Sequence, residues 1–189
     1  MVVYFHMFSS PITFVTGNPD KLKWLQMFTD LPLDYQPLDL HEIQSLDVAK
    51  VVEHKAKDAY KIVKKPVLIE DTSLLFNALG KLPGPLIKWF LNELGNEGLC
   101  KLLDGFKDRS AEAIVLFGLY DGKTFKTFKG KTAGIITDKP RGGNGFGWDS
   151  IFIPVGYDVT WAEMSDKGII KTSIRKRALK KLEKYLKDR

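Results

Sequence analysis

Cysteine and long apolar runs are nearly absent from this sequence of 189 residues. Cys100 is the only cysteine, so an internal disulfide is excluded and a reducing, cytoplasmic environment fits best. The three histidines, His6, His41 and His54, are scattered, which argues against a structural zinc site. No apolar run approaches the roughly 18 residues that a membrane-spanning helix needs. The sequence therefore indicates a cytoplasmic protein without a membrane partner.

The N-terminal segment also lacks the features of a secretory signal. Residues 1–8 are apolar but have no basic flank and no small-residue cleavage site. We interpret residues 1–11 as an N-terminal arm or edge strand. A single domain over residues 12–189 follows, and it is long enough to bury a sizeable core.

Positive charge is concentrated late in the chain. The formal net charge is +6, and ten Lys and Arg residues lie between Lys167 and Arg189. Such a run is compatible with nucleic acid or an acidic small ligand as a partner. A solvated helix face is the ordinary alternative.

The order of predicted elements is that of an α/β protein. Apolar strands alternate with amphipathic helices in the first part of the chain, and Asp121-Gly122 then predicts a hairpin of two long strands. We expect strands at residues 12–16, 35–38, 67–76, 111–120, 124–136 and 151–153. We expect helices over residues 47–63, 86–94 and 96–103. Further helices are expected to begin at residue 19, at residue 161 and after an N-cap at residue 172 or 173. The sheet is therefore expected to be mixed.

The segment from Val67 to Phe76 is unusual because its apolar run contains two adjacent carboxylates, Glu70 and Asp71. A continuous Val/Leu/Ile run predicts a strand that is buried on both faces. Neighbouring residues on a strand point to opposite faces, so we expect Glu70 and Asp71 to have different roles. The alternative is that the pair begins a solvated turn or caps a helix.

Two further segments have the chemistry of ligand contacts. In the turn at residues 16–21, Asn18 suits a helix N-cap and Pro19 the first helical position, and the exposed amides with Lys21 would suit an anion. Residues 141–149 contain four glycines, two aromatics and a carboxylate, which would suit a planar ring. A structural βα connection and a glycine-rich turn beside core aromatics are the respective alternatives.

In combination these motifs are more specific than any one alone. In chain order they are Phe14-Val15-Thr16-Gly17-Asn18 with Lys21, Glu70-Asp71-Thr72, Leu82 to Phe90, Phe146-Gly147-Trp148-Asp149, Ala162-Glu163-Met164, and Ser173 with Arg175. This combination resembles the inosine triphosphate pyrophosphatase family over roughly residues 12 to 187.

The resemblance implies a homodimeric α/β enzyme with an elongated mixed β-sheet and flanking helices that form two lobes around a central cleft. It implies hydrolysis of the non-standard purine nucleoside triphosphates ITP, dITP and XTP to the monophosphate and pyrophosphate. The implied cofactor is Mg²⁺, with Mn²⁺ as the alternative. Such an enzyme removes these nucleotides from the cytoplasmic pool.

The resemblance also assigns roles to residues. It assigns Glu42 and Asp71 to the metal, makes Asp71 the base that activates water, and gives Glu70 a supporting role. The implied substrate-binding residues are Thr16, Gly17, Asn18, Pro19, Asp20, Lys21, Lys55, Asp71, Thr72, Lys88, Phe146, Gly147, Trp148, Asp149, Lys171, Ser173, Ile174 and Arg175. Residues 16–21 with Lys55 and Lys88 would hold phosphate, and the later residues would hold the base.

The chain departs from the family pattern at the base end. One expected lysine is missing, with Lys167 or Lys171 as candidate replacements, and Ile174 stands where the family has histidine. Fewer donors predict weaker discrimination between purines, unless Ile174 is a core residue of the last helix. Two other functions stay open, a catalytically weakened nucleotide-binding relative and a basic nucleic-acid-binding module. Glu42, Glu70 and Asp71 would repel phosphate in that module unless a metal were bound, so we expect no nucleic-acid partner.

Overall fold

The computed structural model describes residues 11–188. In that range the strands are β1 (Ile12–Val15), β2 (Leu33–Gln36), β3 (Val67–Phe76), β4 (Pro83–Gly84), β5 (Ser110–Tyr120), β6 (Phe125–Ile136) and β7 (Phe152–Pro154). The helices are α1 (Pro19–Phe28), α2 (Val48–Val63), α3 (Ile87–Lys101), α4 (Asp166–Thr172) and α5 (Ile174–Lys187), with short 3-10 turns η1 (Asn77–Leu79), η2 (Asp149–Ile151) and η3 (Trp161–Glu163). Apart from Pro11, the expected N-terminal arm lies outside the described residues.

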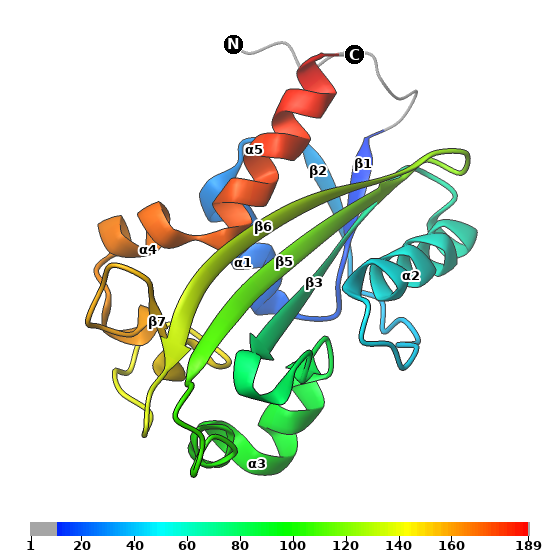
Figure 1. Ribbon diagram of the computed structural model, residues 1–189. Helices are drawn as coiled ribbons and strands as arrows, with labels where there is room; N and C mark the ends of the chain where they lie inside the picture. The colour runs from blue at the N-terminus through cyan, green and yellow to red at the C-terminus, as the bar shows by residue number, and fades with distance from the viewer. Residues whose placement is uncertain (1–10, 189) are drawn as a thin grey trace. The chain divides into compact units, whose positions relative to one another are not determined.

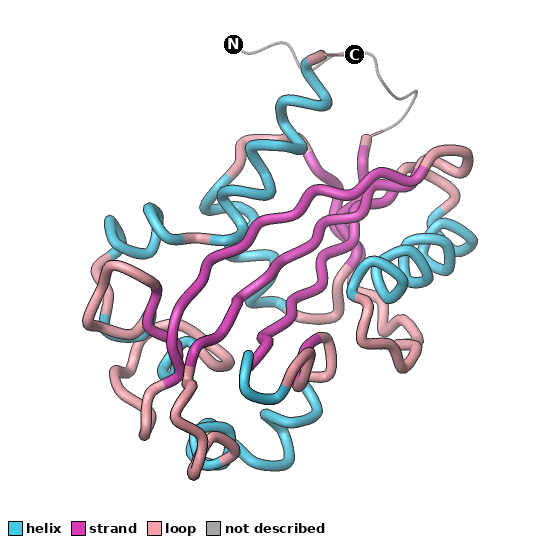
Figure 2. The backbone as a smooth tube through the Cα atoms, viewed as in Figure 1, coloured by secondary structure: helices cyan, strands magenta, loops and turns pink. Residues whose placement is uncertain are grey.

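The strands form one mixed sheet, as predicted, in the order β2-β1-β3-β5-β6-β7, with β4 paired to β3. β1 is parallel to β2 and to β3, whereas β7 is antiparallel to β6. The predicted hairpin joins β5 and β6, which Figure 2 shows as two long neighbouring strands connected by a turn. The second strand was expected at residues 35–38 but spans Leu33–Gln36, because it pairs from Ile12↔Leu33 to Val15↔Gln36.

Contacts divide the chain into two compact units. The described part of the first unit comprises residues 11–71, 115–130 and 175–188, and the second comprises residues 72–114 and 131–174. β3, β5 and β6 contribute residues to both units.

The core of the first unit forms between α2 and the parallel strands (Figure 1). Val52, Ala56 and Ala59 are fully buried, and they pack against β1 and β3 in one cluster. These residues form the apolar stripe expected of an amphipathic helix over residues 47–63. Asp47 caps the helix by accepting a hydrogen bond from the Ala49 amide at 2.9 Å. Burial of this stripe fixes the side of α2 that faces β3.

The core of the second unit contains an aromatic cluster of Trp148, Phe152 and Trp161. The ring centroids of Phe152 and Trp161 are 4.6 Å apart, and that of Trp148 lies 5.8 and 5.6 Å from them. The helix break predicted at Gly95 is present as a kink in α3, where Gly95 has φ 63°. Only glycine adopts this conformation without strain.

Helix α4 was not predicted. Thr172 is the last residue of α4, and its hydroxyl accepts a hydrogen bond from Trp161 Nε1 at 2.8 Å and donates to the Gly168 carbonyl at 2.9 Å. The expectation that Thr172 caps the last helix is therefore wrong, whereas Ser173 directly precedes α5. Gly168 and two β-branched isoleucines are poor helix formers, which hid α4 in the sequence. Within residues 11–188, no helix has the length and apolar character needed to cross a membrane.

Candidate active site

The turn between β1 and α1 is stiffened by its own side chains. Asn18 accepts a hydrogen bond from the Asp20 amide at 2.9 Å, and the Asn18 amide donates to Thr16 Oγ1 at 3.1 Å. Pro19 is the first helical residue, as predicted. Gly17, Asn18 and Pro19 are exposed, so the start of α1 is open to solvent. A rigid, exposed helix start suits an anion, because the helix dipole places partial positive charge there.

Glu70 lies within β3, and its carboxylate is fully buried. Arg175 binds it through three hydrogen bonds of 3.0 to 3.2 Å. Lys21 approaches from α1, and its Nζ donates to the Glu70 main-chain carbonyl at 3.0 Å and lies 3.9 Å from the carboxylate. Because the strand continues to Phe76, the alternative of a turn or helix cap at Glu70-Asp71 is wrong.

Asp71 has different partners. Lys55 donates hydrogen bonds to Asp71 Oδ2 at 2.9 Å and to Glu42 Oε1 at 2.5 Å. Burial lowers the pKa of Lys55, but the charge of Asp71 and the hydrogen bonds that Lys55 donates to Glu42 and Asp71 outweigh that cost, so the pKa rises above its ordinary value of 10.5. Lys55 is therefore a charged residue although only 8% of its surface is exposed.

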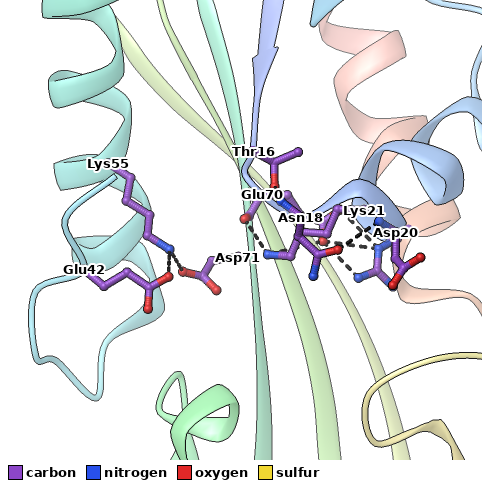
Figure 3. A network of polar contacts seen from close by, with 9 residues as sticks. Thr16, Asn18, Asp20, Lys21, Glu42, Lys55, Glu70 and Asp71 are labelled. Carbon is purple, nitrogen blue, oxygen red and sulfur yellow. Dashed lines mark hydrogen bonds and ion pairs between the residues drawn. The ribbon is translucent and has the colours of Figure 1, made fainter. Parts of the chain in front are cut away.

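β3 separates these two sets of charges. Figure 3 shows Glu70 directed toward Lys21, and Asp71 directed toward Lys55 and Glu42. On the first side one carboxylate meets two cations, and on the second two carboxylates share one cation. The strand's alternation thus places an excess of positive charge beside the α1 turn and an excess of negative charge beside Glu42. The different roles expected for Glu70 and Asp71 agree with this arrangement.

The residues around Asp71 fit a hard divalent cation. The Glu42 and Asp71 oxygens both converge on one ammonium nitrogen, so the space between them already accommodates a positive charge. Within residues 11–188 there is no group of three or more His, Cys, Asp or Glu side chains arranged for a metal. Mg²⁺ retains several waters and needs only one or two carboxylates, so this donor set is sufficient for it.

We expect Lys55→Met to destabilise the metal-free protein by about 1–3 kcal/mol, because it leaves two carboxylates without their shared cation. The loss should shrink when Mg²⁺ is added. Since the folded-state pKa of Lys55 is raised, its contribution is fully present below pH 10.5 and is lost as pH rises through that raised pKa. Denaturant unfolding in EDTA and in Mg²⁺, at neutral pH and above pH 10.5, measures both effects.

Lys57→Met is the matched control. Lys57 lies on the same helix and forms an ion pair with Glu53, but its side chain is 51% exposed. An exposed pair of this kind contributes no more than about 0.5 kcal/mol. Equal losses in the two variants would show that Lys55 is not the counter-ion of the acidic pair.

The residues predicted for the base belong mostly to the second unit. Trp148 is buried in the aromatic cluster, which matches the core-aromatic alternative. Phe146 is half-buried, and its amide donates to Asp149 Oδ2 at 2.9 Å, which closes the loop on itself. Asn96, which the sequence predicts only as the start of a helix, donates to the Gly147 carbonyl at 2.9 Å. This hydrogen bond therefore attaches the loop around Gly147 to α3.

The remaining predicted residues differ in exposure. Lys88 is exposed, with its Nζ 5.5 Å from the Trp89 ring centre, and Lys171 is exposed on α4. Thr72 is half-buried next to Asp71, and Ser173 is buried. Ile174 is only 3% exposed, which favours the interpretation that it is a core residue of the last helix. Its contact with a base stays a prediction.

Two relationships in the site are not evident from the sequence. Arg175 and Glu70 are 105 residues apart, and nothing in either local pattern pairs them. Lys55 lies on a helix that the sequence predicts to be amphipathic, and it is buried between two carboxylates. A lysine inside an otherwise apolar helix face was the available signal, because such a side chain needs an acidic partner.

A model of the Ham1 family matches residues 12–185, so the chain belongs to this family. Among curated relatives, the protein named inosine triphosphate pyrophosphatase from Candida albicans (strain SC5314) is 44% identical, with 94% of this chain and 98% of the relative covered. The protein of the same name from Yarrowia lipolytica is 45% identical, with coverages of 94% and 96%. The family resemblance drawn from the motifs is thus confirmed.

Solved structures give the same result for the fold. A HAM1 protein from Coxiella burnetii matches with a TM-score of 0.82 and 26% identity, over 95% of this chain and all of that one. The Staphylococcus aureus Ham1 protein matches with a TM-score of 0.79 and 25% identity, over 93% and 98% of the two chains. The mixed α/β fold is therefore that of Ham1 proteins.

Proposed function

We propose that this protein is a nucleoside-triphosphate pyrophosphatase that hydrolyses ITP, dITP and XTP to the monophosphate and pyrophosphate. Its named relatives and its family support this function. The observation that carries it at the site is the separation of charge across β3. A triphosphate with its metal ion needs cations and oriented amides on one side and carboxylates on the other.

The residues would divide the reaction as follows. The α1 turn and Lys21 bind and orient the phosphates, and Glu42 with Asp71 would hold one Mg²⁺ ion. When bound, that ion neutralises phosphate charge. Asp71 takes a proton from a water molecule as the water oxygen bonds to the α-phosphorus. The bond from the α-phosphorus to the bridging oxygen breaks, and pyrophosphate leaves.

The competing functions lack comparable support. A nucleic-acid-binding module would use the basic α5 but would leave the acidic pair of Glu42 and Asp71 unexplained. A weakened relative is favoured only by the departures from the family pattern at the base end, near Ile174. We further propose, from the family resemblance, that the enzyme is a cytoplasmic homodimer; light scattering tests the dimer.

Release of pyrophosphate from ITP, with Mg²⁺ and with EDTA, tests the proposal. We expect pyrophosphate and IMP in equal amounts with Mg²⁺ and negligible turnover with EDTA. Binding of ITP without turnover would indicate a weakened relative. Failure to bind ITP, together with salt-sensitive binding of DNA or RNA, would support the nucleic-acid module instead.

A further inference from the structure

Arg175 is assigned to the base by resemblance, yet its guanidinium binds the carboxylate of Glu70. Its Nε lies 3.2 and 3.1 Å from the two carboxylate oxygens, and a terminal nitrogen lies 3.0 Å from Oε1. The Glu70 side chain is fully buried, and that of Arg175 is 11% exposed. Forked contacts between arginine and a carboxylate are among the strongest charge-assisted hydrogen bonds.

Lys21 forms a long ion pair with the same carboxylate but no hydrogen bond to it. Its Nζ donates to the Glu70 carbonyl at 3.0 Å but is 3.9 Å from Oε1, which is too long for a hydrogen bond. Arg175 contacts both carboxylate oxygens. The ammonium of Lys21 therefore keeps a position near the α1 turn instead of moving onto Glu70.

We infer that Arg175 is a positioning residue that saturates Glu70 and thereby keeps Lys21 available for the outer phosphates of the substrate. This inference rests on the proposed function. Without Arg175, the buried Glu70 carboxylate would lose its counter-charge, and an uncompensated buried charge is costly. Lys21 is the neighbouring cation that would be drawn onto it and away from the phosphates.

The variant Arg175→Leu tests the inference through calorimetric binding of a non-hydrolysable ITP analogue and of IMP, both with Mg²⁺. We expect the triphosphate analogue to bind about 10- to 100-fold more weakly, the range for one charge-assisted contact, and IMP to bind nearly as before. Adding Glu70→Gln removes the carboxylate that would capture Lys21. The double variant should therefore recover most of the lost triphosphate affinity.

The control is Arg177→Leu, which changes an exposed arginine on the same helix and should leave both affinities unaltered. Equal weakening of IMP and the triphosphate analogue, without recovery in the double variant, would show that Arg175 contacts the base, because both ligands contain the base. Unchanged binding in Arg175→Leu would also overturn the inference.

Two further outcomes are decisive. If Arg175→Leu does not fold, the double variant alone tests the inference, because it lacks both Arg175 and the buried Glu70 carboxylate. Weak binding of the triphosphate analogue by the double variant would then contradict the inference. A parent protein that binds neither ligand contradicts the proposed function itself, and the inference falls with it. A parent that binds both ligands isolates the role of Arg175.

Discussion

Asp71→Asn is expected to abolish turnover of ITP while the fold stays intact. The change is nearly isosteric, but it removes the proposed base and weakens a carboxylate of the proposed metal site. Loss of a general base alone typically costs about 10²- to 10⁴-fold in rate, and loss of a metal ligand adds to it. The rate constant kcat at saturating ITP and Mg²⁺, with thermal unfolding as a check of the fold, measures the effect.

Asp34→Asn is the matched control for this experiment. Asp34 lies on β2. Its side chain is 49% exposed, and its carboxylate forms a long ion pair of 3.8 Å with Lys65. We expect its kcat and unfolding temperature to match those of the parent, because an exposed pair of this length contributes little. If Asp71→Asn retained activity within a small factor of the parent, Asp71 would be neither base nor essential metal ligand.

Lys21→Met should weaken binding of a triphosphate much more than binding of a monophosphate. The ammonium is held next to the α1 turn by the Glu70 carbonyl, where outer phosphates would meet both the charge and the helix amides. One lost charge-assisted contact corresponds to roughly 1.5–3 kcal/mol, or about 10- to 100-fold in affinity. Calorimetry with a non-hydrolysable ITP analogue and with IMP measures the two affinities.

Lys23→Met provides the comparison for Lys21. Lys23 is on the same helix and has the same charge, but its side chain is 77% exposed and its partner is Asp20, 3.5 Å away. The control should bind both ligands as the parent does. Equal losses of triphosphate and monophosphate affinity in Lys21→Met would mean that Lys21 does not contact the outer phosphates.

Much of the fold could be predicted because local signals agreed with one another. The continuous apolar run of β3, the stripe of α2 and the Asp121-Gly122 turn each specify an element whose pattern admits few alternatives. Strand β2 was shifted by two residues, since its register is set by pairing with β1 and not by its own composition. Helix α4 was missed because the contact of Thr172 with Trp161 stabilises a segment of low helix propensity.

The site was predictable in its residue types but not in its pairings. Strand alternation was enough to assign Glu70 and Asp71 different roles. The partners of these carboxylates could not be predicted from local patterns. Arg175 contacts Glu70 only once α5 is packed in the fold, and Glu42 contacts Lys55 only when its loop folds against α2. For the same reason, the burial of Ile174 and Trp148 could not be separated from a ligand-binding role by their positions in the motifs.

Hydrolysis of ITP in water enriched in oxygen-18, followed by mass spectrometry of the products, tests the central claim most directly. The claim is that β3 presents phosphate to a water molecule activated at Asp71, and that this water attacks the α-phosphorus. The expected result is one labelled oxygen in IMP and none in pyrophosphate. Label in pyrophosphate, or formation of IDP with labelled inorganic phosphate, would contradict it.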